Sequence, residues 1–353
     1  MRFMGTLLLI MALAGSALAG EFQKSFDFDA DELQIRNMIG AVEVRPASGD
    51  QIKVSIHVRG ADADENLITF DTEGRGEKVF TIQFPIDEHD KYVYPEMGRN
   101  SKSTIRYRDE EGGSWLRRIF GGGEKVTVRG RGGGLEVWAD VLVEVPADRE
   151  VEVKLGVGSI DAHEVDAELV LDTHSGSITA RDMGGELLCD TGSGHVMVEG
   201  MKGRLTVDTG SGNVEVARCE GPTVLVDTGS GSVEATGIDC QKLTIDTGSG
   251  SVQARRVRTD HAHIDTGSGS VLLQLDRMGD GRFIIDTGSG SITMDLPDDA
   301  SARILAENGS GSMNMELQGA MVEHKSRDEM KLIVGDGDAK VTLDAGSGSI
   351  TVK

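Results

Sequence analysis

The chain has 353 residues, a formal net charge of −23, 48 glycines and only 4% aromatic residues. A surface this acidic repels phosphate backbones and anionic lipids, which argues against nucleic acid and membrane partners. Abundant glycine with few aromatic side chains is expected of closely stacked strands joined by small turns, rather than of a bulky globular core.

The first 20 residues carry one basic residue, Arg2, then an apolar run from Leu7 to Ala14 and a small-x-small end at Ala17 to Ala19. This pattern is typical of a secretory signal peptide that is cleaved after Ala19 or Gly20. No later segment approaches the roughly 18 to 20 apolar residues that span a bilayer. We therefore expect an exported protein, periplasmic or extracellular, with no membrane insertion after signal removal.

After the signal peptide we expect N-terminal β coils over 21–84, then an irregular insertion over 85–134. Between Asp90 and Arg131 the insertion holds ten basic and six acidic residues. A structureless insertion longer than about 15 residues is usually functional or disordered. Aromatic side chains beside arginines favour a binding loop, and the alternatives are a floppy segment or a short packed helix over 115–120. The candidate binding residues are Tyr92, Tyr94, Arg106, Tyr107, Arg108, Trp115, Arg117 and Arg118.

From 135 to 353 the chain is dominated by a short repeat, Asp-Thr-[Gly/His]-Ser-Gly, which recurs every 18 to 21 residues. Relative to the repeat aspartate, positions −3, −1, +6 and +8 are apolar in every copy. Alternation with period two on both sides of a glycine-rich link predicts two short strands per repeat, each with one buried face. Glycine at +4 indicates a positive φ or a close approach between stacked turns. The seven copies begin at Asp172, Asp190, Asp208, Asp227, Asp246, Asp265 and Asp286.

The same frame fits four further segments, 33–44, 151–160, 304–315 and 341–350. A repeat of this length lets equivalent strands of successive coils pair in parallel, about 4.8 Å apart. The sequence therefore predicts an all-β fold, a single-stranded parallel β-helix (β-solenoid) with about 18 to 21 residues per coil. The crossover preference of parallel strands predicts a right-handed solenoid.

Three cysteines are present in a chain expected to be exported. Cys189 takes an apolar position in its repeat, whereas Cys219 and Cys240 are expected in the turns of successive repeats. One interpretation is a disulfide between Cys219 and Cys240 across one coil. The alternative is that all three cysteines are reduced thiols.

The repeat aspartates are expected to face outward as a column, because they alternate with the buried −1 and −3 positions. Neighbouring carboxylates about 5 Å apart repel by roughly 1 kcal/mol in water-like surroundings. Hydrogen bonds from the backbone of each aspartate's own turn would offset this repulsion. The alternative is Ca²⁺ held between successive carboxylates, although each repeat offers only one carboxylate and no cofactor is otherwise expected.

Catalytic motifs are scarce. The sequence Asp227-Thr-Gly resembles an aspartic protease loop, but tandem copies place their aspartates side by side rather than face to face. The chain contains no Gly-x-Ser-x-Gly, His-Glu-x-x-His or Gly-Lys-[Ser/Thr] motif. A β-helix polysaccharide lyase would need Arg or Lys beside its aspartates, and the outward positions show no such cluster beside the Asp column. We therefore expect a non-enzymatic protein.

The segment Val141 to Pro146, the serial Asp-Thr-Gly-Ser-Gly-Ser-Val copies and the final Asp-Ala-Gly-Ser-Gly348-Ser-Ile together resemble a bacterial β-strand-repeat domain. That domain of unknown function is labelled "putative adhesin", and its relatives are called toastrack domains. The resemblance covers nearly all of the chain from about Leu33, except the insertion. It implies a stacked-strand fold, a cell-envelope association and no assigned catalytic residue.

The leading hypothesis is an exported, non-enzymatic β-solenoid scaffold or adhesin-like envelope protein, which binds an envelope or extracellular polymer or protein through the insertion. The alternatives are a carbohydrate-active β-helix enzyme and an envelope-stress sensing module.

Overall fold

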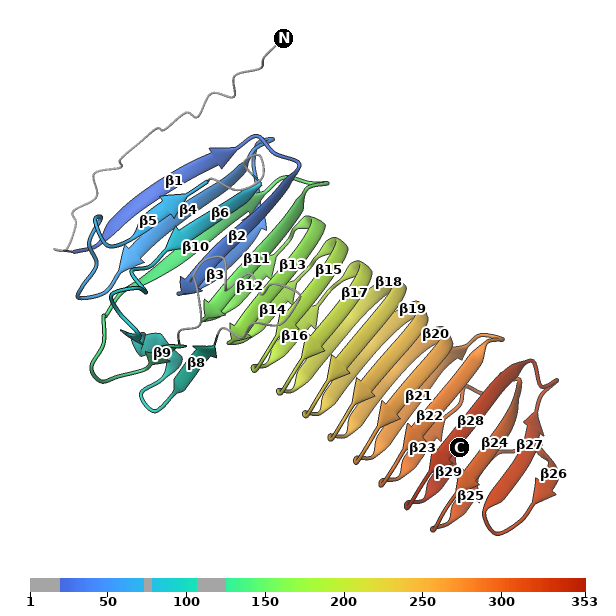
Figure 1. The fold of residues 1–353 in the computed structure, drawn as a ribbon. Helices are drawn as coiled ribbons and strands as arrows, with labels where there is room; N and C mark the ends of the chain where they lie inside the picture. The colour runs from blue at the N-terminus through green and yellow to red at the C-terminus, as the bar shows by residue number, and fades with distance from the viewer. Residues whose placement is uncertain (1–19, 73–77, 107–124) are drawn as a thin grey trace. The chain divides into compact units, whose positions relative to one another are not determined.

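The structure is a computed structural model that describes residues 20–72, 78–106 and 125–353. In these ranges the chain forms β-strands and one short 3-10 helix, η1 (Pro95–Met97). None of the described residues belongs to a helix long and apolar enough to cross a membrane. The chain divides into two compact units, Met1–Thr179 and Ala180–Lys353. The predicted all-β class and β-solenoid architecture are confirmed (Figure 1).

The described residues of the first unit form thirteen strands that lie wholly within it. They are β1 (Phe22–Phe28), β2 (Glu32–Ile39), β3 (Val42–Pro46), β4 (Ile52–Arg59), β5 (Thr69–Asp71), β6 (Val79–Gln83), β7 (Lys91–Val93), β8 (Lys102–Arg106), β9 (Lys125–Arg129), β10 (Trp138–Val145), β11 (Glu150–Val157), β12 (Ile160–His163) and β13 (Asp166–Ser175).

The coil at 33–44 stacks directly on the coil at 151–162, although more than 100 residues separate them. Strand β11 pairs in parallel with β2, so that Val151 lies opposite Leu33. Strand β12 pairs in the same way with β3, and Ile160 lies opposite Val42. The predicted register of the first coil is therefore confirmed. The residues between the two coils form additional strands around them.

Strands β4 and β10 extend the β3 side of these coils into a broader sheet. Strand β10 pairs in parallel with β3 and antiparallel with β4, and β4 pairs antiparallel with β1. On the other side β6 pairs with β2 and β5 pairs with β6. Phenylalanines gather between these strands, and the Phe26 and Phe80 ring centroids are 4.8 Å apart.

The predicted insertion at 85–134 is not irregular in its described part. Strand β9 pairs in parallel with β7 and antiparallel with β8, which gives a separate three-stranded sheet. Ile105, Val126 and Val128 are buried. Alternating Val-Thr-Val and Ser-Thr-Ile segments supply this small core, a period-two signal that the basic composition of the segment obscured.

The second unit continues the repeat. Its strands are β15 (Gly184–Thr191), β16 (Val196–Glu199), β17 (Lys202–Thr209), β18 (Val214–Thr228), β19 (Val233–Thr247), β20 (Val252–Thr266), β21 (Val271–Met278), β22 (Arg282–Thr287), β23 (Ile292–Asp295), β24 (Ala302–Asn308), β25 (Met313–Met315), β26 (Met321–Lys325), β27 (Glu329–Val334), β28 (Ala339–Ala345) and β29 (Ile350–Val352); β14 (Ile178–Arg181) spans the boundary between the units.

The buried column of the second unit is the one predicted from the repeat. Positions −3, −1, +6 and +8 are buried in every copy, as Val224, Val226, Val233 and Ala235 illustrate. The threonine at +1 is also fully buried in each copy, which the sequence analysis did not assign. The repeat positions therefore supply five inward side chains per copy, one of them polar, and some coils bury others, such as Ile238 and Val257.

Glycine at +4 is required by a close approach between stacked turns, and in three copies, Gly176, Gly194 and Gly212, φ is also positive, at 152°, 159° and 155°. A Cβ on Gly250 would lie 2.0 Å from the carbonyl oxygen of Gly231 in the coil before it. A side chain there would displace backbone, so the glycine is structural.

Several coils turn a second corner without a break in the strand. Strands β18, β19 and β20 each run for 15 residues, and their corners fall at Arg218, Gly237 and Arg256, which have φ of 54°, 68° and 53°. This left-handed conformation costs roughly 1 to 2 kcal/mol for a residue other than glycine. Two strands per repeat is thus too simple a prediction here.

The last coils are not stacked in sequence order. Strand β28 pairs with β22 on one side and with β24 on the other (Figure 1). After β23 the chain leaves the position next to β22 empty and forms β24 to β27. It then returns, and β28 occupies the position between β22 and β24. Strand β27 pairs antiparallel with β24, and β26 with β27, at the end of this unit.

Candidate functional site

The sequence-predicted aromatic residues that the structure describes are not available as a binding surface. Tyr92 is 0% exposed and Tyr94 3% exposed. The ring of Tyr94 packs 5.7 Å from that of Trp138, and burial raises the pKa of the Tyr94 hydroxyl far above its usual value. Both rings belong to the core between the small sheet and its neighbours, so their assignment to an exposed binding loop is wrong for this conformation.

The other predicted binding residues fall at or beyond the end of β8. Arg106 is the last residue of β8, and its backbone pairs with Lys125 of β9. Tyr107, Arg108, Trp115, Arg117 and Arg118 lie outside the described residues, as does the signal peptide except Gly20. Their roles stay predictions.

The three cysteines are free and buried. Cys219 and Cys240 lie in strands β18 and β19 rather than in turns, and the register places Cys219 opposite Ile238 and Cys240 opposite Gly221. The expected bridge is therefore not formed, because the two residues are two positions out of register. Burial raises the pKa of Cys189 to about 12 and that of Cys219 to about 11, which keeps both as unreactive thiols.

The Asp column faces outward as predicted. In the second unit Asp190, Asp208, Asp227, Asp246, Asp265 and Asp286 lie opposite one another on adjacent strands, and Asp344 continues the column. The pKa values of Asp208, Asp227 and Asp286 are raised, first by partial loss of water and then by repulsion from neighbouring aspartates.

The hydrogen bonds expected to relieve this repulsion are not formed by Asp208, Asp227, Asp246, Asp265 and Asp286; none of these carboxylates accepts a bond from a described backbone N–H of its turn. Within the described ranges no group of three or more His, Cys, Asp or Glu side chains could hold a metal ion. Asp227 and Asp246 point the same way on adjacent strands, so the protease-like sequence does not form a facing carboxylate pair.

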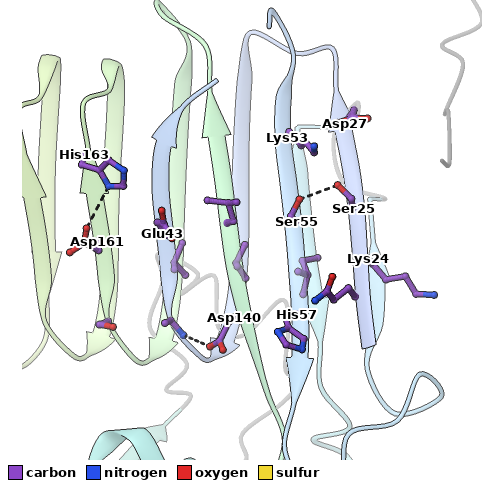
Figure 2. A pocket seen from close by; sticks show the side chains of 17 residues that line it. Lys24, Ser25, Asp27, Glu43, Lys53, Ser55, His57, Asp140, Asp161 and His163 are labelled. Carbon is purple, nitrogen blue, oxygen red and sulfur yellow. Dashed lines mark hydrogen bonds and ion pairs between the residues drawn. The ribbon is translucent and has the colours of Figure 1, made fainter. Parts of the chain in front are cut away.

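The first unit carries a groove of about 940 Å³ on the outward face of five adjacent strands. We call it the N-terminal groove. The strands lie in the order β12, β3, β10, β4 and β1 (Figure 2). Their inward residues, such as Val44, Val143 and Val54, are buried. The alternate residues face outward and are mostly polar, because a strand presents successive side chains to opposite faces.

Side chains from different strands cross the N-terminal groove in rows. The central row is Asp161, Glu43, Leu142, Ser55 and Ser25, one from each strand. One flanking row contains Asp140, His57 and Gln23, and the other contains Lys53 and Asp27. The surface thus offers hydroxyl, amide, carboxylate and ammonium groups around a single aliphatic side chain.

Part of this polar surface is fixed by internal bonds. Asp140 accepts hydrogen bonds from the backbone N–H of Ala41 at 3.0 Å and from Arg59 Nη1 at 3.1 Å, and the bond from Asp140 raises the pKa of Arg59. The hydroxyls of Ser25 and Ser55 are 3.1 Å apart. Exposed Asp27 and Glu43 have no ion-pair partner among the described residues, so both carboxylates can accept bonds from a ligand.

The groups in the N-terminal groove do not converge on one reacting atom. His163 Nδ1 lies 3.7 Å from Asp161 Oδ1 on β12, but Ser55 is on β4, three strand spacings or roughly 14 Å away. His57 Nε2 instead contacts Glu21 at 3.3 Å. Within the described part of the chain no serine hydroxyl is hydrogen-bonded to a histidine, the arrangement that nucleophilic catalysis by serine requires. The geometry suits binding of an extended polar ligand.

The fold is a repeat-built β-solenoid, and its first unit carries an open polar groove. The family model described as Toastrack DUF4097 matches residues 139–353. This is more than half of the chain, and the chain belongs to this Toastrack family of domains of unknown function.

Two solved structures match the chain at low similarity. One is titled a "putative cell adhesion protein" from Clostridium sporogenes ATCC 15579, with 11% identity, 94% of this chain and 99% of that chain covered, and a TM-score of 0.22. The other is titled a "putative adhesin" from Bacteroides fragilis NCTC 9343, with 10% identity, coverage of 94% and 97%, and a TM-score of 0.38. At such TM-scores neither bears on the function of this chain. No curated protein matches it.

The N-terminal groove could not be predicted from the sequence. The alternation of polar and apolar residues in 22–28, 52–58 and 138–145 does mark the outward polar positions. However, the groove exists only because β10 inserts between β3 and β4, a pairing between segments about 90 residues apart.

Proposed function

We propose that this chain is an exported, non-enzymatic β-solenoid that acts as an envelope or extracellular scaffold and binds a surface polymer or protein through the N-terminal groove. The observation that carries the proposal is the groove itself, an open polar surface that spans five strands and whose acid, base and hydroxyl groups stand apart from one another.

The repeat supports a scaffold role. Its constant residues serve the stack: the apolar column and the threonines are buried, and the +4 glycines allow close packing of turns. Residues that the repeat needs for folding are not free to form a catalytic centre. Since the inward positions are fixed by packing, the coils differ mainly at their outward positions. Such surfaces are typical recognition faces of repeat proteins.

Export is supported by residues 1–20, whose basic start, apolar run and small-residue end match a secretory signal. The Toastrack family assignment agrees with an envelope role but names no ligand.

To test export, the full chain is expressed with its own leader in a bacterial host. The N-terminus of the protein is then determined in each cell fraction. We expect the mature chain to begin at Gly20 or Glu21 outside the cytoplasm. Purified mature protein is then sedimented with isolated cell envelopes. Ser55→Arg, which fills the centre of the N-terminal groove, should weaken binding at least tenfold.

The matched control is Gln253→Arg, which adds the same charge at an exposed outward position of β20. It should bind as the wild type does. Equal binding by wild type and Ser55→Arg would remove the groove from the proposal. A full-length chain retained in the cytoplasm would contradict export.

A further inference from the structure

A row of cations crosses the second unit, four residues before the Asp column and its neighbour Glu307. We call Lys242, Arg282, Lys340 and Arg303 the cation row. They lie on strands β19, β22, β28 and β24, and His261 of β20 lies between Lys242 and Arg282 (Figure 1). The register sets Lys242 opposite His261, Arg282 opposite Lys340, and Lys340 opposite Arg303. The Arg282 backbone N–H also donates to His261 Nδ1 at 3.1 Å.

The cation row is exposed and has no carboxylate partner. All four residues are exposed, and none forms an ion pair with a described residue. Several other arginines of this unit are paired: Arg218 with Glu199, Arg255 with Glu234 at 3.7 Å, and Arg258 with Asp239 at 3.1 Å. Unpaired cations on adjacent strands are unexpected in a chain with a net charge of −23.

No carboxylate of the described residues forms an ion pair with the cation row. On one side the Asp column lies four residues along each strand, roughly 13 Å away, and screening at physiological salt acts over about 8 Å. On the other side Asp239 is paired with Arg258 and Asp260 with Arg277 at 2.7 Å. Asp280 and Asp338 lie two residues before Arg282 and Lys340, and Asp338 accepts a hydrogen bond from Ser301 Oγ at 2.7 Å. The Asp column would also repel an anion, which confines the anion to the row.

A second row lies between the cation row and the Asp column. It consists of Thr244, His263, Ile284, Thr342 and Leu305, again one from each strand. Ile284 and Leu305 are half-buried aliphatic side chains. They offer a flat apolar strip beside the charges, against which the C–H faces of sugar rings can pack.

We propose that the cation row binds a linear anionic glycan, with carboxylate or phosphate groups, that runs across the strands. One exposed ion pair contributes little on its own, so a small anion would bind weakly. Arg282, Lys340 and Arg303 lie on adjacent strands about 4.8 Å apart and can hold several anionic groups of one chain at once. The choice of a glycan as the ligand rests on the proposed envelope function. The charge and the geometry of the cation row are independent of that proposal.

This surface corrects the expectation that outward positions hold no cluster of basic residues beside the Asp column. Arg303 and Lys340 are separated from Arg282 in sequence, and only the non-sequential placement of β28 and β24 brings all three together. Since the two rows are roughly 13 Å apart, their charges cannot act on one glycosidic bond, and we expect binding without cleavage.

The test compares the wild type with the triple variant Arg282→Gln/Arg303→Gln/Lys340→Gln. Labelled polygalacturonate and a phosphate-substituted dextran probe the two anionic groups, and plain dextran, monomeric galacturonate and inorganic polyphosphate serve as comparisons. We expect at least one anionic glycan to bind the wild type and to bind the triple variant at least tenfold more weakly. Plain dextran and the monomer should not bind.

The matched control is Arg218→Gln/Arg255→Gln/Arg258→Gln, which removes the same charge from paired arginines and should stay within twofold of the wild type. An equal loss in this control would reduce the effect to net charge and overturn the proposal. So would unchanged binding by the triple variant, or tighter binding of polyphosphate than of either glycan. Ser55→Arg should keep its glycan binding, which separates failure of the cation row from failure of the N-terminal groove.

Discussion

The side-chain hydroxyl of Thr266 donates a hydrogen bond to the carbonyl oxygen of Gly250 at 2.9 Å, across 16 residues of one coil. The same bond joins Thr247 to Gly231 at 3.1 Å. A Cβ on Gly269 would lie 2.0 Å from that Gly250 oxygen. The repeat threonine therefore donates a hydrogen bond to this carbonyl oxygen, and the repeat glycine leaves room for it. Packing of the turns thus explains why the motif contains both residues.

The first prediction concerns this bond. Thr266→Val keeps the shape of the side chain but leaves a turn carbonyl with one partner fewer, so it should destabilise the protein by about 1 to 2 kcal/mol. Thr244→Val, on the outward face of β19, should change stability by less than about 0.5 kcal/mol. Urea denaturation measures both, and an equal effect of the two would show that the buried bond contributes nothing special.

The assignment of strand faces gives a second prediction. Val226 is 0% exposed whereas Leu225 is half-buried on the outward face. Val226→Asp buries an unpaired charge and should cost more than about 3 kcal/mol. Leu225→Asp should cost far less. Chemical denaturation of both variants compares the two faces directly, and similar losses would contradict the register.

The Asp column predicts a pH dependence. The pKa of Asp227 is raised above 3.8, chiefly by burial and then by Asp246. The folded state therefore binds the proton more tightly than the unfolded state, and the ionised carboxylate destabilises the fold at neutral pH. Asp227→Asn should gain a few tenths to about 1 kcal/mol at pH 7, after allowance for solvent screening.

This gain should shrink as pH falls through the raised pKa and vanish below 3.8, where the wild-type carboxyl is protonated in both states. The control Asp239→Asn removes a carboxylate paired with Arg258 and should bring no gain. Thermal unfolding between pH 7 and pH 3.5 follows the difference. A gain that grows with acidity would have the wrong sign for this account.

The hairpin of β8 and β9 predicts which part of the insertion can be removed. Arg106 and Lys125 lie opposite each other at the strand ends, so replacing 107–124 by Asn-Gly should close a two-residue turn. Stability should change by less than about 1 kcal/mol, because the buried residues of the small sheet remain. Deleting Lys91 to Gly130 instead removes buried Tyr92 and Tyr94 and should be strongly destabilising.

The same replacement tests where recognition lies. The account predicts that the shortened protein still sediments with envelopes, since the N-terminal groove is intact. Loss of envelope binding by a folded shortened protein would return recognition to Tyr107, Arg108, Trp115, Arg117 and Arg118, as the sequence indicates.

Features that depend on residues close together in the sequence could be predicted, and features that depend on long-range strand pairing could not. Period-two alternation is local, so the buried residues of each coil could be predicted, and 33–44 could be placed in the frame of the repeat. Its stacking on 151–162 is a long-range pairing that only the structure shows. The N-terminal groove and the cation row could not be predicted, because each depends on strands that leave the sequential order, β10 beside β3 and β28 beside β22. Tyr92 and Tyr94 were misassigned because composition does not distinguish a buried aromatic residue from an exposed one.

The central claim is binding without turnover, and one time course tests it. Purified mature protein is incubated with isolated envelopes, and bound protein and soluble saccharide or peptide are measured together over many hours. The account predicts saturable binding, lost in Ser55→Arg and kept in Gln253→Arg, with no soluble product above the protein-free control. Product that accumulates in proportion to time and to wild-type protein would contradict it and establish an enzyme.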